Sequence, residues 1–351
     1  MILTGDIALG ELPPPVIEGL PDRLRRVDWL GNLEGPVSRT VPDQNAVYSS
    51  ERSYNRLVTA LPFKALSLAN NHIDDLTPRD VTYTQRIVEG SRIVPFGIGT
   101  TQHTAYHRAY LPAGPSESNT VVLNYAWSVI GCTPATRQRA GCTDVDPDRM
   151  ISEVTAERAA RPDHGIVVYL HWGIELEVAP QPFHRALAHR LVDAGADLIV
   201  GCHAHRYQGA EIYRGKTIAF GIGNWMFARQ HFWGGRLDYP AGCNAQYLVE
   251  YDPENRTAQL HQVDYVSNET LRYVGPVHPD EANAQHGIRP FTDMTQGEYD
   301  AYFPTVRTKT KLLPIYRADD PAAIRKMKDN WITLRHRLIM ALLWVRKRMA
   351  S

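Results

Sequence analysis

Short apolar runs alternate along the chain with a segment of helical periodicity. A helix is predicted over Phe183–Ala194, where an apolar residue recurs every four positions and Gly195 provides a C-cap. Seven apolar runs are predicted to be buried strands: Met1–Thr4, Val27–Leu33, Leu66–Ala69, Val121–Tyr125, Ile166–Leu170, Leu198–Val200 and Thr217–Phe220. This alternation predicts an α/β sandwich.

The pattern changes after about residue 245. Gln246–Tyr251 and Gln259–Tyr265 are predicted to form a β-meander, whereas residues 271–321 show little periodicity. A long amphipathic helix is predicted over about 322–349, with an apolar seam spaced alternately by three and four residues: Ile324, Met327, Trp331, Leu334, Leu338, Ala341 and Val345. We therefore expect one domain over residues 1–265 and a C-terminal extension over residues 266–351 that ends in this helix.

Charge is balanced over the whole chain but not along it. The 38 basic and 38 acidic residues cancel, which argues against a specific nucleic-acid binder. Residues 322–351 carry eight Lys or Arg against Asp329 alone, so this segment has a net charge of 8 − 1 = +7. The predicted helix is expected to pack on the body, or on a partner helix in a homo-oligomer or complex. Peripheral contact with an anionic membrane is the alternative.

Composition indicates a globular protein with a sizeable core. Hydrophobic residues make up 43% and charged residues 22% of the 351 positions. The four cysteines form no C-x-x-C pair and favour a reducing compartment. Because neither a signal peptide nor a membrane-spanning apolar run is seen, we expect a cytoplasmic location.

Polar residues gather where the predicted strands end. Ligands of open α/β sheets bind outside the carboxyl ends of the strands, so these residues are candidate metal ligands. The strongest pattern is Gly201-x-His203-x-His205, because alternate residues of an extended segment point to the same side. The other candidates at strand ends are Asp6, Glu34, Asn71 and His171. Taken singly, Asp6 and Glu34 are better explained by a turn or a cap, and an Asx-turn explains Asn71 equally well, so it is the whole set that favours metal binding.

His72 and Asp75 are the candidates for proton transfer. A histidine beside a ligand can protonate a leaving group, and a carboxylate three residues on can orient its ring. An Asx-turn followed by a helix cap explains the same residues without any chemistry. Asn32, Glu175 and Arg206 are weaker candidates for contacts with an anionic substrate.

Several motifs together resemble the CapA-type family of capsule and poly-γ-glutamate biosynthesis proteins, within the calcineurin-like metallophosphatase superfamily. They occur in family order over about residues 2–265: Thr4-Gly5-Asp6, Asn32-Leu33-Glu34-Gly35, Leu68-Ala69-Asn70-Asn71-His72, Phe96-Gly97-Ile98-Gly99, His171-Trp172-Gly173, Gly201-Cys202-His203-Ala204-His205 and Gly221-Ile222-Gly223-Asn224. The resemblance implies a four-layer α/β/β/α sandwich with a two-metal site, and we expect one or two divalent ions there, Mn, Fe or Zn.

The resemblance also implies roles for individual residues. Asp6, Asn71, His171, His203 and His205 match metal ligands, Glu34 stands at the bridging carboxylate, and His72 matches the catalytic histidine. The superfamily's first motif is Asp-x-His, and Ala8 stands here in place of that histidine, so one metal position loses a ligand.

Two function classes follow from these residues. The first is a metal-dependent hydrolase or transferase acting on a phosphate ester, or on an acyl or amide bond of a carboxylate-bearing, γ-glutamyl-like substrate. The second is a non-catalytic binding or assembly component of a polymer-forming or amide-forming complex. Ala8 favours the second class, because the metal site lacks one ligand. His72 favours the first class, because a purely structural metal site does not need a proton donor.

Overall fold

Two β-sheets packed face to face form the centre of the molecule in a computed structural model, which describes residues 1–42, 46–75, 78–112 and 119–349. The larger sheet has nine strands in the order β2-β19-β18-β17-β1-β3-β6-β7, and β16 pairs with β1. Its strands are β1 (Ile2–Ala8), β2 (Val16–Glu18), β3 (Trp29–Leu33), β6 (Phe63–Ser67), β7 (Val94–Phe96), β16 (Asn224–Phe227), β17 (Ala245–Asp252), β18 (Thr257–Ser267) and β19 (Thr270–Val277).

The smaller sheet has six strands in the order β14-β15-β13-β12-β10-β9. These strands are β9 (Ala109–Leu111), β10 (Thr120–Ala126), β12 (Gly165–His171), β13 (Leu198–Cys202), β14 (Ala210–Tyr213) and β15 (Lys216–Ala219). Two short pairs lie outside both sheets: β4 (Val37–Ser38) with β5 (Ser49–Ser50), and β8 (Ile98–Gly99) with β11 (Gly141–Cys142).

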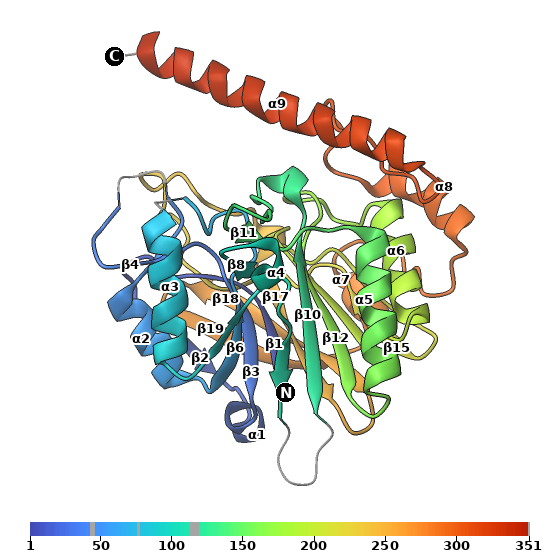
Figure 1. The fold of residues 1–351 in the computed structure, drawn as a ribbon, viewed down its shortest axis with the longest axis horizontal. Helices are drawn as coiled ribbons and strands as arrows, with labels where there is room; N and C mark the ends of the chain where they lie inside the picture. The colour runs from blue at the N-terminus through green and yellow to red at the C-terminus, as the bar shows by residue number, and fades with distance from the viewer. Residues whose placement is uncertain (43–45, 76–77, 113–118, 350–351) are drawn as a thin grey trace.

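Helices cover the outer face of each sheet, which completes the four layers (Figure 1). The larger sheet is covered by α1 (Asp22–Arg26), α2 (Glu51–Ala60) and α3 (Pro78–Gly90), and the smaller sheet by α5 (Pro147–Ala160) and α6 (Pro182–Asp193). Short helices α4 (Gln102–Ala105), η1 (Ser128–Ile130) and η2 (Ala241–Cys243) lie in loops. The predicted α/β/β/α sandwich is therefore confirmed.

The predicted elements of the sandwich are all present. The seven predicted strands correspond to β1, β3, β6, β10, β12, β13 and β15, the predicted helix to α6, and the meander to β17 and β18. Strands β1, β3 and β6 run parallel, as do β10, β12, β13 and β15. The carboxyl ends of both sets therefore gather at one edge of the sandwich, where the candidate ligands stand.

The segment 271–321 contains more structure than its weak periodicity predicts. It holds most of β19, α7 (Pro279–Gln285) and α8 (Gln296–Val306), and α8 begins with a capping box formed by Thr295 and Glu298. Position 265, the predicted end of the first domain, lies inside β18, which pairs with β19 across that position.

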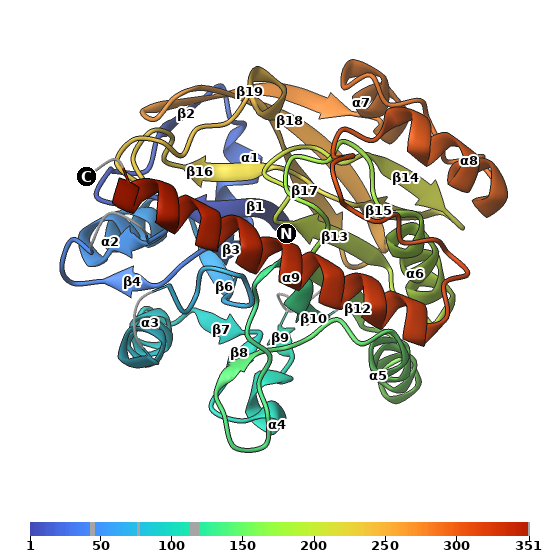
Figure 2. The same ribbon diagram turned by 90° about the horizontal axis from the view of Figure 1, so that it is seen from above.

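The predicted seam of the C-terminal helix α9 (Ala322–Met349) does not pack on the body. Its described residues are 37–59% exposed, and these are Ile324, Met327, Trp331, Leu334 and Leu338. Figure 2 shows this helix lying across the top of the molecule. Polar contacts hold it there: Lys328 donates to the Ile315 carbonyl, and the Tyr316 hydroxyl donates to Asp329. Among the described residues of α9 the buried apolar side chain is Ile332, which lies outside the seam and belongs to the main core, so this helix packs on the body through a residue other than the predicted seam.

Other expectations about the extension stay predictions. The side chains of Ala341 and Val345 lie outside the described residues. A partner helix and a membrane surface both remain predicted occupants of the exposed seam. Within the described ranges, no helix combines the length and the apolar content that crossing a bilayer requires.

A buried ion pair joins the C-terminal segment to the smaller sheet. Arg185 on α6 pairs with Glu211 on β14 at 2.7 Å, and both are at most 1% exposed. The same guanidinium donates to the carbonyls of Phe291 and Met294, just before α8. His189 contacts the second carboxylate oxygen at 2.8 Å. Arg185 therefore needs its carboxylate partner, because a buried charge without one is strongly unfavourable.

We expect Glu211→Gln to lower the free energy of unfolding by about 3–5 kcal/mol, because it leaves the buried guanidinium uncompensated. Chemical denaturation followed by circular dichroism measures this loss. Asp193→Asn at the exposed Arg214–Asp193 pair is the matched control, and it should cost less than about 1 kcal/mol. Equal losses in the two variants would contradict the anchoring role of Glu211.

Candidate metal centre

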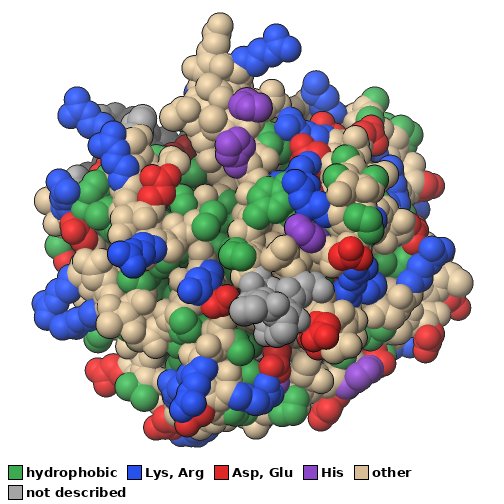
Figure 3. Space-filling view, turned by 60° about the horizontal axis from the view of Figure 1, so that its bottom comes forward, with side chains coloured by type: hydrophobic (Ala, Val, Ile, Leu, Met, Phe, Trp, Pro, Cys, Tyr) green, Lys and Arg blue, Asp and Glu red, His purple; other side chains and the backbone are tan. Residues whose placement is uncertain are grey.

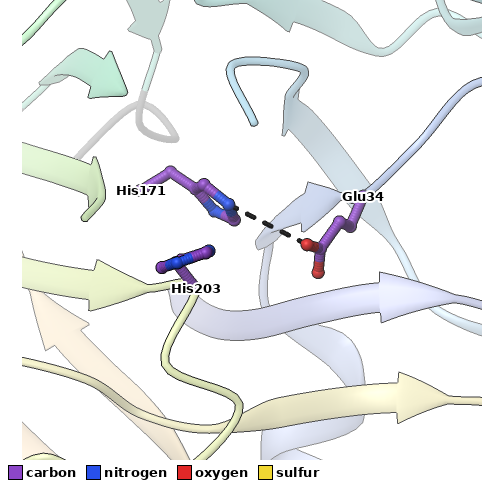
Figure 4. A group of neighbouring side chains, drawn as sticks. All are labelled: Glu34, His171 and His203. Atoms are coloured by element: carbon purple, nitrogen blue, oxygen red, sulfur yellow. Dashed lines mark ion pairs between the residues drawn. The ribbon is translucent and has the colours of Figure 1, made fainter. Parts of the chain in front are cut away.

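The candidate ligands meet at the carboxyl edge of the two sheets. Asp6 lies within β1, Glu34 directly follows β3, His171 ends β12, and His203 and His205 follow β13. All five are at most 5% exposed. Figure 4 shows Glu34 from one sheet pointing at His171 and His203 from the other. The sandwich thus brings together ligands that are far apart in the sequence.

Glu34 stands at the centre of this group. Its Oε1 atom lies 3.9 Å from the Nε2 atoms of His72, His171 and His205. Neither carboxylate oxygen has a hydrogen-bond partner, and the buried Nδ1 of His203 also lacks one among the described residues. Ligand atoms about 2.0–2.2 Å from a shared ion lie at roughly such separations from one another. The orphaned buried atoms therefore fit a divalent cation.

Two overlapping sets of donors share Glu34. Their possible ligand atoms all lie within 4.8 Å of one another, in the groups Glu34, His171, His203 and Asp6, Glu34, His205. This arrangement is compatible with one ion or with two bridged by Glu34. Ala8 is fully buried among aromatic side chains, yet the second set still has three members without it.

Asp6 is held rigidly by its neighbours. Its Oδ1 accepts from Asn32 Nδ2 at 2.7 Å, and its Oδ2 accepts from the backbone N–H of His203 at 2.8 Å. Burial raises the pKa of Asp6, but hydrogen bonding and charge from His171, with the charge of His205, outweigh burial and keep that pKa below its usual value. Asp6 is therefore ionised, the state in which a carboxylate binds a cation.

Burial acts in opposite directions on the other ligands. It raises the pKa of Glu34 well above its usual value, helped by the charges of Asp6, Asp75 and Glu175. Burial lowers the pKa of His171 against the opposing hydrogen bond and charge of Asp6, and it lowers the pKa of His203 much further, which keeps the His203 ring neutral. Neutral imidazole is the metal-binding form, and a bound cation would favour the ionised carboxylate of Glu34.

The two histidines after β13 reach the site by a different route from the one predicted. His203 and His205 have φ values of 86° and 55°, so the segment is bent and not extended. This left-handed conformation is strained for residues other than glycine. Alternation in a strand was therefore the wrong reason, although both histidines do belong to the groups built around Glu34.

The Asn71–Asp75 segment adds the proposed proton donor. His171 Nε2 lies 2.7 Å from Asn71 Oδ1, and His72 Nδ1 lies 2.8 Å from Asp75 Oδ2. The same Asp75 oxygen accepts from the backbone N–H of Val47 at 2.9 Å. The His72 ring is thereby fixed with its Nε2 facing Glu34.

Two asparagines support the site without a role having been predicted for them. Asn70 accepts from Gly35 N–H and donates to the Leu33 carbonyl, so it holds the turn that carries Glu34. Asn224 Oδ1 lies 2.8 Å from His205 Nδ1 and orients that ring. Both stand in motifs of the family resemblance, which is the signal that marks them.

The three weaker candidates for substrate contact lie at different positions relative to the two ligand groups. Asn32 is buried and lies 3.2 Å from His171 Nδ1, so it is a part of the ligand network. Glu175 is exposed, near enough to affect the charge of Glu34. Arg206 is half-buried beside Gly242 and belongs to neither ligand group. Contact of these residues with a substrate stays a prediction.

Fold and site together define an α/β/β/α protein with a buried histidine and carboxylate centre of the kind that binds divalent cations. The family described as bacterial capsule synthesis protein PGA_cap matches residues 2–229, and the chain belongs to this family. The resemblance predicted from the motifs is thus confirmed.

Curated relatives carry capsule and polymer names. The chain is 26% identical over 247 residues to the capsule biosynthesis protein CapA of Bacillus anthracis, covering 65% of this chain and 59% of the relative. It is 32% identical over 206 residues to a probable polyglutamine synthesis accessory protein of Mycobacterium tuberculosis, covering 56% and 53%. The chain thus spans little more than half the length of these relatives.

Solved structures resemble the chain more distantly. A hypothetical protein from Thermus thermophilus has a TM-score of 0.40 and 17% identity, covering 79% of this chain and 98% of its own. The sulfate thiohydrolase SoxB from the same species has a TM-score of 0.40 and 13% identity, covering 70% of this chain and 38% of its own.

We expect the purified protein to carry at least one divalent transition metal ion per chain, and His203→Ala to lower that content. Metal binding stabilises the folded state by mass action, so the variant should also unfold at a lower temperature. Elemental analysis and a thermal melt measure the two effects.

His184→Ala is the matched control for this prediction. His184 is equally buried, but it stacks on Trp172 at 4.6 Å and lies outside both ligand groups. The control should lose stability yet retain the metal. Sub-stoichiometric metal in the unaltered protein after mild purification would contradict the assignment of the centre.

Proposed function

We propose that the protein is a metal-dependent hydrolase or transferase. The observation that carries the proposal is the Glu34 carboxylate, buried among three imidazoles with both oxygens unpartnered among the described residues. Such a group is costly to bury unless a cation compensates it. Bound divalent ions would supply charge stabilisation of a developing oxyanion and a lowered pKa for water.

His72 is the proposed general acid. Its Nε2 faces the centre, and Asp75 holds its Nδ1, which fixes the orientation of the ring. At 16% exposure the side chain can exchange a proton with solvent while still facing the ligands. The leaving group would accept the proton from Nε2.

The proposed substrate is anionic and carries a carboxylate, as a γ-glutamyl chain does. Names of the relatives, which refer to capsule and polyglutamine synthesis, support this choice over an unrelated phosphate ester. An amide or acyl bond and a phosphate ester both develop negative charge on oxygen, so the same centre serves either. All four cysteines are unpaired, which supports the cytoplasmic location proposed from the sequence.

The second candidate function is a non-catalytic binding component. Two observations favour it: Ala8 stands where the superfamily has a ligand, and one relative is described as an accessory protein. In that case the ion would stabilise the fold, and a polymer or partner would bind elsewhere on the surface.

His72→Gln should lower turnover by about 10²–10⁴-fold, the usual contribution of a general acid, with metal content and thermal stability retained. Phosphomonoesters, phosphodiesters and γ-glutamyl amides, each with Mn, Fe or Zn, form the assay panel. His103→Gln, at an exposed histidine outside both ligand groups, is the control and should leave turnover unchanged.

Unchanged turnover in His72→Gln would show that His72 is not the acid. If no member of the panel reacts while metal-free protein still binds polymer, the second candidate function is favoured instead.

A further inference from the structure

Two adjoining grooves lie beside α2, β4 and α3, on the outer side of the larger sheet. Their volumes are about 780 Å³ and about 610 Å³, and Ser38 and Arg39 line both of them. The three elements lie together at the blue end of the chain, on the left of Figure 1. Each volume falls in the range of ordinary ligand pockets.

Arginines are the main charged residues of the groove walls, against one carboxylate in each groove, Glu51 and Asp80. Arg52 and Arg56 stand one turn apart on α2 and line the first groove, while Arg79 and Arg86 stand two turns apart on α3 and line the second. Arg39 lies between the two pairs. Five guanidinium groups therefore border the two adjoining grooves, which together are called the basic depression, in a protein whose overall charge is zero.

The central arginine contacts residues of both helices from an exposed position. Arg39 lies 3.6 Å from Glu51, and its guanidinium stands 4.2 Å above the ring of Tyr83. The Tyr83 hydroxyl donates to Glu51 at 2.5 Å, which ties α3 to α2. These contacts hold the two helices at the distance that separates the two pairs of arginines.

The outer four arginines have no such partners. Among the described residues, Arg52, Arg56, Arg79 and Arg86 make no hydrogen bond or ion pair, and all four are exposed. Blue basic side chains are frequent along the left margin of Figure 3, the side on which α2 and α3 lie. Like charges one turn apart destabilise a helix slightly, so this arrangement does not contribute to stability. An anionic ligand would relieve the repulsion.

We propose that this depression binds an extended anionic chain that carries a carboxylate on each unit, such as polyglutamate. Guanidinium groups bind carboxylates through two parallel hydrogen bonds, and spaced arginines fit spaced carboxylates. A single-stranded nucleic acid fits less well, because it needs exposed aromatic faces and Arg39 already covers Tyr83. The identity of the polymer rests on the proposed function, whereas the anion site rests on the arginines.

The groove lies close to the metal centre along the chain. Glu34 and Ser38 are separated by four residues, a span of at most about 14 Å in an extended backbone. A polymer of several units lying in the groove would therefore have an end within reach of the centre. The site would retain the chain while one of its bonds is presented to the ligands.

Binding of fluorescently labelled poly-γ-glutamate, followed by anisotropy, tests the proposal on the full chain. Arg52→Gln/Arg86→Gln should weaken binding about tenfold, which corresponds to about 1.4 kcal/mol. Arg26→Gln/Arg137→Gln removes the same net charge from exposed positions outside the grooves, and should change binding less than about twofold. Arg56→Gln/Arg79→Gln is a second test pair, and thermal melts establish that each variant is folded.

Three results would overturn the proposal: no binding by the unaltered protein, equal weakening by the test and control pairs, or tighter binding of single-stranded DNA that depends on the same arginines. Polymer binding by the His72→Gln variant distinguishes this proposal from the proposed catalysis. It should bind the polymer as tightly as the unaltered protein, so loss of turnover and loss of binding are distinguishable.

Discussion

The Glu34 carboxylate is buried without a hydrogen-bond donor among the described residues, and the surrounding structure is arranged to hold it there. Gly35 makes the necessary turn, with φ of 81° and a position where a Cβ atom would lie 2.1 Å from the Val47 carbonyl oxygen. Asn70 fixes the same turn by side-chain hydrogen bonds. Because an isolated buried charge is very unfavourable, this arrangement is compatible with a divalent cation, which would compensate the carboxylate and bind the neutral imidazoles.

The two sheets must keep a constant distance for the centre to form, since each supplies only part of it. The Tyr169 hydroxyl of β12 donates to the Thr4 carbonyl of β1, which joins the sheets beside the ligands Asp6 and His171 on the same two strands. The hydrogen bonds of His203 N–H to Asp6 and of the His205 ring to Asn224 help to retain the strained conformations of these two histidines. Strained backbone at candidate site residues persists where the neighbouring structure fixes them.

Local pattern predicted the strands and the clustering of the candidate ligands, because buried parallel strands are continuous apolar runs and their polar carboxyl ends converge. It did not predict the bend at His203, which depends on contact with Asp6 from a distant strand. Nor did it predict α8, whose short sequence offers no long apolar stripe and is fixed by Arg185 through the preceding carbonyls. The helix α9 was predicted correctly, but its apolar seam is exposed. Amphipathic periodicity specifies a helix, but it does not specify the surface that covers the apolar side of that helix.

The basic groove and the proposed acid share one segment of chain. Val47 donates to Asp75, which orients His72, and three residues later Ser50 caps α2 by accepting from the Ser53 N–H. Arg52 stands in that first turn, so the backbone that holds the acid in position also begins the wall of the groove. A ligand bound to Arg52 would contact the segment that the hydrogen bond from Val47 to Asp75 joins to the candidate metal centre. The proposed polymer site and the proposed proton donor are thus built on the same short stretch of chain, which would allow a surface depression and a buried centre to act on one polymer.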